Sequence, residues 1–204
     1  EHQVFRQFIY ERQSEGKKRM YHQMLAEYYE SKAEGKKNFG YLPMTIHHYE
    51  KCHNMVKAYQ YKIKYLKEYY TIVNENFPVL HWEMEYGDDN YGVTFEANEL
   101  LELAQKVIQF DEDSHQLQEM KKEMYYVKGR FDIAVGDYAS GIRNIEESMK
   151  LAEMLEDKKS LLNNFKQMIF YGIQVEDLEL VKKYVDEGLS LINVQEPDER
   201  GAFV

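Results

Sequence analysis

The sequence predicts an all-α protein built as a stack of antiparallel helical hairpins, an α-solenoid. Three observations lead to this fold class. Apolar residues recur with the helical period in almost every segment. Only 3 prolines and 11 glycines occur in 204 residues, which leaves little room for the tight turns of an all-β protein. Finally, one apolar pattern recurs at an offset of 40 residues, as expected of a repeat protein.

Helices are expected along most of the chain, in an order set by the apolar stripes and the turn residues. Met20, Met24 and Tyr28 follow one another at steps of four, and Pro43 suits the first turn of a second helix. Residues 77–92 are left open between a helix and a loop. The predicted helices cover residues 17–33, 43–52, 55–74, 94–108, 115–134, 138–156, 160–174 and 178–192.

The repeat is carried by the segments 137–145 and 177–185. Each begins with aspartate and continues with apolar or small residues at +4, +8, +11 and +14. A small residue at +4, such as Gly141, lets the second helix of a hairpin approach the first closely. The alternative is a generic helical bundle in which two amphipathic helices match by chance.

Composition excludes several classes of protein. A hydrophobic content of 44% with 30% charged residues is typical of a folded domain rather than a disordered chain. The net charge of −10 argues against direct nucleic-acid binding, which needs a clustered positive face. No apolar run is long enough to cross a membrane. A single cysteine, Cys52, favours a reducing compartment, so we expect a cytoplasmic location.

Residues capable of chemistry are present but do not converge in the sequence. His47, His48, Cys52 and His53 form the densest group of candidate metal ligands. On a helix His48 and Cys52 share a face, yet the other two need not point the same way. We therefore expect no metal, no cofactor and no catalytic residue, and the protein is not predicted to be an enzyme. The enzyme alternative would need a nucleophile and a base brought together by the fold.

The second half resembles degenerate tetratricopeptide repeats with lengthened helices. Gly129, seven residues before Gly136, fits the small residue of the first helix in that pattern. In such arrays the first helices line a concave groove, where aromatic and basic side chains can hold a ligand. Counting from Gly129 and adding the 40-residue offset gives the predicted groove residues Tyr126, Arg130, Lys166 and Phe170.

The first half carries a different resemblance. The segment 5–11, followed by Ser14 and by His22, is similar to the exit of the winged-helix segment in signal-transduction ATPases (STAND) of the MalT-like type. The segment 46–54, with Lys57-Ala58, is similar to the stretch that opens the helical-repeat arm of those proteins. The resemblance implies a multidomain bacterial transcription regulator. It comprises an ATPase switch, a winged-helix connector, a helical-repeat sensor arm and an output domain.

This resemblance predicts three parts of the chain. Residues 1–33 would end the winged-helix connector and link it to the arm, residues 34–194 would form the helical repeats, and residues 195–204 would be a tail or a truncated next repeat. No G-x-x-x-x-G-K-[ST] phosphate loop occurs in these 204 residues, so the ATPase itself would lie outside them.

The predicted function is that of a non-catalytic regulatory module. Its expected partners are a small-molecule, peptide or protein ligand in the groove, together with the ATPase and output domains of the same longer chain. Homo-oligomerisation is also possible for such a module. Two alternatives remain at this stage, a peptide-sensing tetratricopeptide regulator and a protein–protein scaffold.

Overall fold

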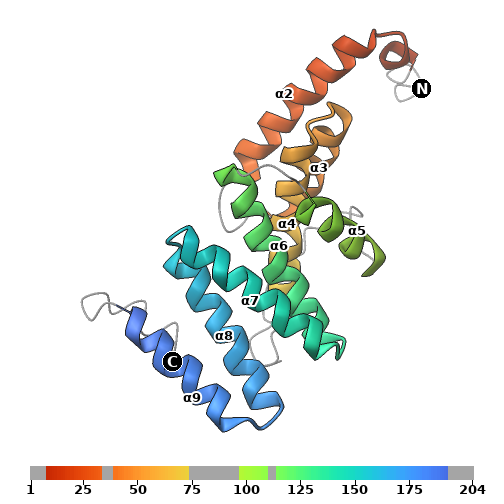
Figure 1. Ribbon diagram of the computed structural model, residues 1–204. Helices are drawn as coiled ribbons and strands as arrows, with labels where there is room; N and C mark the ends of the chain where they lie inside the picture. The colour runs from red at the N-terminus through yellow and green to blue at the C-terminus, as the bar shows by residue number, and fades with distance from the viewer. Residues whose placement is uncertain (1–7, 34–38, 74–96, 110–113, 193–204) are drawn as a thin grey trace. The chain divides into compact units, whose positions relative to one another are not determined.

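The computed structural model describes residues 8–33, 39–73, 97–109 and 114–192, and every regular element among them is helical (Figure 1). This confirms the predicted all-α class. After a helical turn at residues 8–11, the elements are α2 (Glu15–Ala33), the 3-10 helix η1 (Phe39–Tyr41), α3 (Leu42–Lys51), α4 (Met55–Val73), α5 (Ala97–Ile108), α6 (His115–Ala134), α7 (Tyr138–Met154), α8 (Lys158–Gln174) and α9 (Leu178–Leu191).

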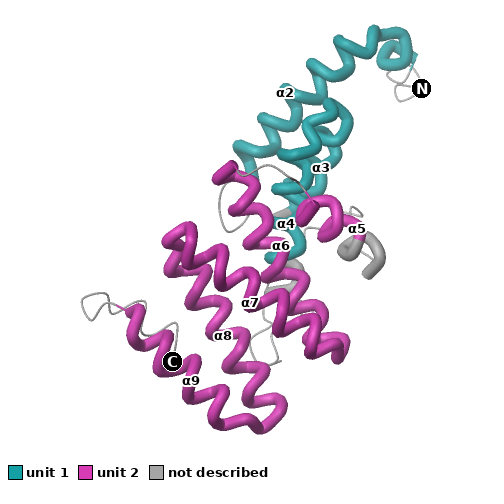
Figure 2. The backbone as a smooth tube through the Cα atoms, in the orientation of Figure 1, with its two compact units in different colours: residues 1–95 teal, residues 96–204 magenta. Residues whose placement is uncertain are grey.

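The chain divides into two compact units, Glu1–Phe95 and Glu96–Val204 (Figure 2). This division falls inside the 34–194 segment that was predicted to form the repeats. Helix α2 ends at Ala33, next to the first predicted boundary. Residues 77–92 and the predicted tail 195–204 lie outside the described residues.

One tight turn joins each pair of consecutive helices from α6 to α9. Its middle residue has a left-handed conformation, with φ of 88° at Gly136, 56° at Glu156 and 58° at Glu176. In the first turn the amide of Asp137 donates to the carbonyl of Asp132, the bond that satisfies a free carbonyl at a helix end. The other two turns repeat this bond with their own aspartates.

The last residue of each turn also begins the next helix. The side chains of Asp137, Asp157 and Asp177 accept bonds from the amides of Ser140, Ser160 and Leu180, at 3.2, 3.1 and 3.0 Å. Aspartate is a favoured N-cap because its carboxylate satisfies a free amide in the first helical turn. The three caps lie 20 residues apart, and the two helices between them, α7 and α8, are each 17 residues long.

Glycine sets the distance between α6 and α7. A Cβ atom placed on Gly129 would lie 2.9 Å from the carbonyl oxygen of Gly141, and one placed on Gly141 would lie 2.6 Å from Cγ1 of Ile133. The two backbones therefore approach too closely for any side chain at these positions. In the next pair, Gly172 of α8 lies against Val181 of α9, where an added Cβ would be 2.8 Å from the valine side chain.

Helices α6 to α9 share one apolar core. It is formed by buried side chains from all four helices, namely Ile133, Ile145, Met149, Ala152, Leu161, Phe165, Met168 and Tyr184. Because the core is continuous through consecutive helices, the C-terminal unit is held together by neighbour-to-neighbour packing.

In the N-terminal unit, α2, α3 and α4 pack around small apolar clusters. Ala26, Tyr49 and Ala58 form one of them, with one residue from each helix. Next to it, the Glu30 carboxylate accepts hydrogen bonds from the hydroxyls of Tyr49 and Tyr61, and its oxygen lies 2.6 Å from Lys57 Nζ. Glu30 thus ties its own helix, α2, to both of the others.

Candidate functional site

The four predicted groove residues form two similar pairs. On α6 the guanidinium of Arg130 lies 5.6 Å from the centre of the Tyr126 ring. On α8 the ammonium of Lys166 lies 5.6 Å from the centre of the Phe170 ring. Both pairs have the i, i+4 spacing that places side chains on one helix face. The 40-residue offset relates the two pairs with their residue types exchanged, since Tyr126 corresponds to Lys166 and Arg130 to Phe170.

These pairs differ in how far they are available to a ligand. Lys166 is exposed, while Arg130 and Phe170 are half-buried. Tyr126 is also half-buried and packs partly against the apolar core of the unit. The two helices that carry the pairs, α6 and α8, contact each other. The assignment of these residues to a ligand groove stays a prediction.

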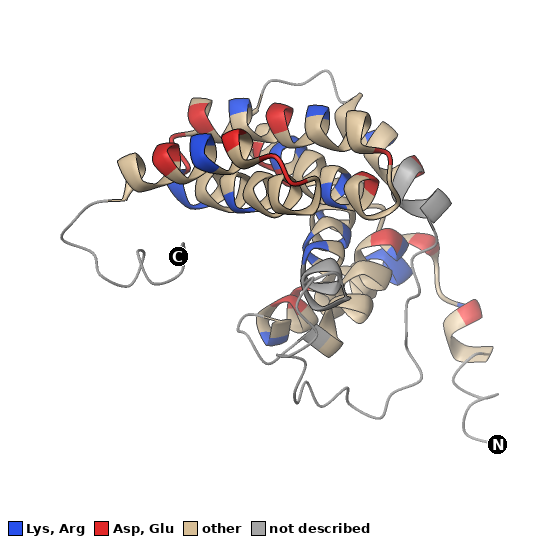
Figure 3. Cartoon of the chain, turned by 90° about the horizontal axis from the view of Figure 1, so that it is seen from below, with Lys and Arg blue, Asp and Glu red and all other residues tan. Residues whose placement is uncertain are grey.

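The charges on the described helices are mixed. Lys and Arg alternate with Asp and Glu along them in Figure 3, and several are joined in ion pairs within one helix, such as Lys150 with Glu147. Within the described helices no long stripe of one sign is seen in this view. Such a surface offers local contacts to a ligand rather than a broad field for a polyanion.

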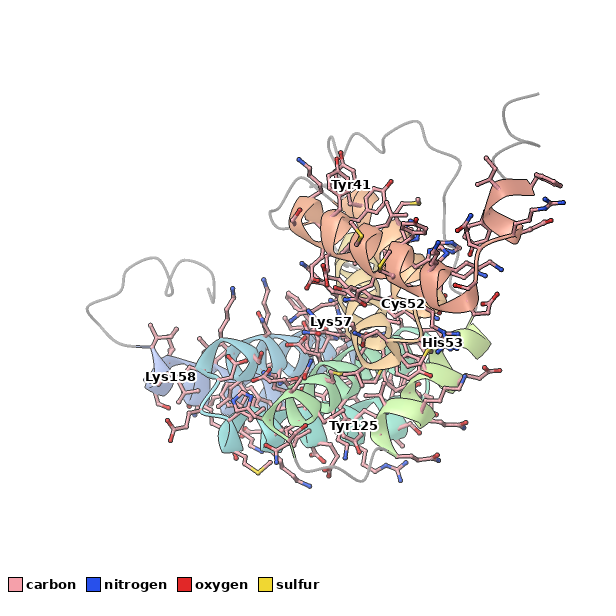
Figure 4. The ribbon with its side chains drawn as sticks, turned by 90° about the horizontal axis from the view of Figure 1, so that it is seen from above. Tyr41, Cys52, His53, Lys57, Tyr125 and Lys158 are labelled. Carbon is pink, nitrogen blue, oxygen red and sulfur yellow. The ribbon has the colours of Figure 1, made fainter. Side chains whose placement is uncertain are left out.

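The candidate metal ligands of the sequence take separate positions. Cys52 and His53 lie next to each other at the turn after α3 (Figure 4), but the Cys52 thiol faces Gln23 Oε1, at 3.3 Å, and His53 is exposed. His47 is exposed, whereas His48 is buried. Among the described residues, no three histidine, cysteine or acidic side chains converge as a metal site.

His48 instead contacts a histidine on another helix. Its Nδ1 lies 2.8 Å from Nδ1 of His22 on α2, and the Nε2 of His22 lies 2.8 Å from the hydroxyl of Tyr10. The ring of Tyr29 stacks on His48 at 5.5 Å. This group of side chains fastens α2 to α3 and forms the densest cluster of titratable rings in the described N-terminal unit.

A buried cation fastens the helices of the C-terminal unit. Lys122 of α6 is 1% exposed, and its Nζ lies 2.6 Å from Oδ2 of Asp157, the N-cap of α8. Glu119 forms a second ion pair with the same ammonium. Burial by itself would raise the pKa of Asp157, but hydrogen bonds from Lys122 and Ser160 outweigh it and lower that pKa to about 2. Asp157 is therefore both a cap and a counter-ion.

The sequence analysis predicted neither the first of these contacts, between His22 and His48, nor the second, between Lys122 and Asp157. A signal for the second was present, since Asp137, Asp157 and Asp177 recur every 20 residues and only Asp157 has a lysine buried against it. The signal for the first was weaker. His22 lies four residues before Ala26, on the face of α2 that is buried, but no spacing rule connects it to His48.

Comparisons with family models, curated proteins and solved structures find no match to this chain. The described helices include none with the length and apolar character required to cross a bilayer. The functional interpretation therefore rests on the sequence and on the geometry above.

Proposed function

We propose that the chain is a non-catalytic regulatory module, the helical-repeat sensor arm of a cytoplasmic bacterial transcription regulator of the MalT-like type. The observation that carries this proposal is the regular succession of α6 to α9. Three turns of one geometry, spaced by 20 residues, join helices that share a continuous core. Tetratricopeptide-like arrays are built from such units, and their usual role is to bind other molecules.

The ligand would bind along the first helices of the two hairpins, α6 and α8. Each helix carries a cation over an aromatic ring one helical turn away, with the two residue types in opposite order on the two helices. Such pairs suit a ligand that combines negative charge with an apolar or aromatic part. A small metabolite, a peptide or a protein segment could supply that chemistry.

Regulation would follow from the way in which the helices are linked. In a hairpin array each repeat contacts only its neighbours, so small rotations between repeats add along the stack. A ligand that prefers one curvature shifts the population toward it, by as much as its affinities for the two curvatures differ. The bound state would then be communicated to the ATPase and output domains of the longer chain.

The proposal is tested by ligand screening followed by matched variants. The full chain is screened by thermal shift against a metabolite set and a library of short peptides. For a compound that raises the melting temperature, Arg130→Ala and Lys166→Ala should each weaken binding at least tenfold in calorimetry. Lys150→Ala, which removes an exposed lysine from α7, should leave binding unchanged.

Two outcomes would contradict this assignment. If both substitutions leave the affinity of the compound unchanged, the ligand does not bind along α6 and α8. If the chain turns over a compound in the metabolite set, it is an enzyme and the proposal is wrong. A preference for peptides over all metabolites would instead favour the peptide-sensing alternative.

A further inference from the structure

The two buried histidines of the N-terminal unit share a hydrogen bond of an unusual kind. It joins Nδ1 of His22 on α2 to Nδ1 of His48 on α3, at 2.8 Å. Since a neutral imidazole has one N–H group and one lone pair, such a bond needs a proton on one Nδ1 and none on the other. His22 is 9% and His48 8% exposed, so water has little access to replace this bond.

The bond limits how many protons the pair can hold. In the neutral pair one Nδ1 carries the shared proton. The first added proton can be accommodated with this bond intact, because His22 can then donate from Nδ1 to His48 and from Nε2 to the hydroxyl oxygen of Tyr10. A second added proton would place hydrogen on both Nδ1 atoms. Two donors would then face each other at 2.8 Å with two like charges, and the rings would have to separate.

Among the described residues, the groups that shift the pKa values of His22 and His48 include no carboxylate. Helix α3 contributes His47 and Lys51, and both disfavour a charged His22. The hydroxyl of Tyr10 lies against His22, and the ring of Tyr29 on α2 stacks on His48. On α4, Lys57 is already paired with Glu30 of α2. The pKa of His22 is accordingly lowered, mainly by burial, and burial together with His47 and His22 lowers the pKa of His48 to about 4.

We propose that the His22–His48 contact is a proton-operated latch between α2 and α3. The two helices stay joined while the pair holds no more than one added proton. Binding of a second proton separates the rings and frees the first half of α2, together with Tyr10 and the helical turn that contains it. The latch does not depend on the proposed function of the molecule, because it follows from two rings, one hydroxyl and their burial.

The expected loss of protection in α2 follows from the protons that the two histidines take up when their contact opens. In the open state both histidines have their ordinary pKa, near 6.5, so opening takes up protons as the pH falls below that value. Protection factors for the amides of residues 19–26, measured by hydrogen exchange on the full chain, should fall at least tenfold between pH 7 and pH 4.5. Residues 138–191 contain no histidine, and their protection should stay constant.

Substitutions distinguish opening of the His22–His48 contact from a general loss of stability of the chain in acid. His48→Asn keeps a polar group near the Nδ1 position but does not titrate, so the pH step in α2 should disappear. His115→Asn removes an exposed histidine from the first turn of α6 and should leave the step unchanged. If His48→Asn does not fold, as judged by circular dichroism, His22→Asn provides the same test. Histidine ¹⁵N spectra of the unsubstituted chain should also show one shared Nδ1 proton at neutral pH.

The proposal is wrong if protection of α2 stays flat from pH 7 to pH 4.5. It is also wrong if the step persists in the folded asparagine variants. Independent titration of both histidines near pH 6.5 in the ¹⁵N spectra would contradict it as well, because the rings would then not be coupled.

Discussion

The crossing of α6 and α7 depends on two residues that have no side chain. Gly129 and Gly141 each place a backbone where a Cβ atom would overlap its neighbour. Interiors packed at this density respond to an added group by shifting side chains and backbone, at a cost of a few kcal/mol. The sequence predicted this role for Gly141 from its place four residues after Asp137, and the contact geometry agrees with that prediction.

The substitution Gly141→Leu should therefore lower the free energy of unfolding by about 1–3 kcal/mol through overpacking. Ala139→Leu is the matched control, since Ala139 is exposed on the same helix and should change stability by less than about 0.5 kcal/mol. Urea unfolding followed by circular dichroism measures both. If Gly141→Leu unfolds at the same urea concentration as the parent chain, the helices do not cross tightly at Gly141.

The left-handed turn residues have different chemical identities. Gly136 adopts this conformation without strain, whereas Glu156 and Glu176 adopt it with a Cβ atom present. For residues other than glycine this conformation costs roughly 1 kcal/mol. Glu176→Gly should then stabilise the chain by up to about 1 kcal/mol.

Its control is Glu179→Gly, three residues later and inside the first turn of α9. There glycine loses helix propensity, so the same chemical change should destabilise the chain by up to about 1 kcal/mol. Thermal unfolding of the two variants gives the comparison. A loss of stability in Glu176→Gly would mean that the turn does not hold the left-handed conformation.

At the scale of helices, the end of a helix could be predicted where a cap or turn residue marks it in the sequence. The range His115–Ala134 was predicted at both ends, because Ser114 and Gly136 are strong local signals. The start of α8 was predicted two residues late, at Ser160, because its cap is Asp157 and the predicted start ignored the recurrence of aspartate every 20 residues. Local chemistry therefore determines these helix ends.

Contacts between helices were harder to predict. The pairing of His22 with His48 requires α2 and α3 to meet in one particular register, and no spacing in the sequence specifies that register. The Lys122–Asp157 pair likewise joins residues 35 positions apart. The assignment of the pairs on α6 and α8 to a ligand groove, made from the repeat offset, stays a prediction.

The Lys122–Asp157 pair gives a pH dependence that can be measured. The pKa of Asp157 is about 2 in the folded chain, below its ordinary value of 3.8, so the ion pair stabilises the fold above about pH 4. That stability, up to about 2 kcal/mol, should be lost as the pH falls from 4 toward 2. Asp157→Asn should be clearly less stable than the parent chain at pH 7 and nearly equal to it at pH 2.

Asp177→Asn is the control for this experiment. Asp177 caps α9 in the same way, but no buried lysine is paired with it in the described structure. Since asparagine is also a good cap, this substitution should have a small effect at both pH values. Equal destabilisation by the two substitutions at pH 7 would show that Lys122 contributes nothing through Asp157.

At the scale of the whole molecule, the two units present different chemistry. The N-terminal unit is fastened by hydrogen-bonded side chains, among them Glu30 and the buried histidines. The C-terminal unit repeats one turn and one type of helix contact. In the regulator that we propose, the hairpins of α6 to α9 would bind the ligand and the helices before them would transmit the signal.

The central claim is that this chain functions as the sensor arm of a longer regulator, and intact-mass spectrometry of the protein isolated from its native cells tests it most directly. We expect a mass well above the 24.5 kDa of these 204 residues. Tryptic peptides of the same protein should also include a G-x-x-x-x-G-K-[ST] phosphate loop on the N-terminal side of Glu1. A native protein of about 24.5 kDa, or a longer one without that loop, would contradict it.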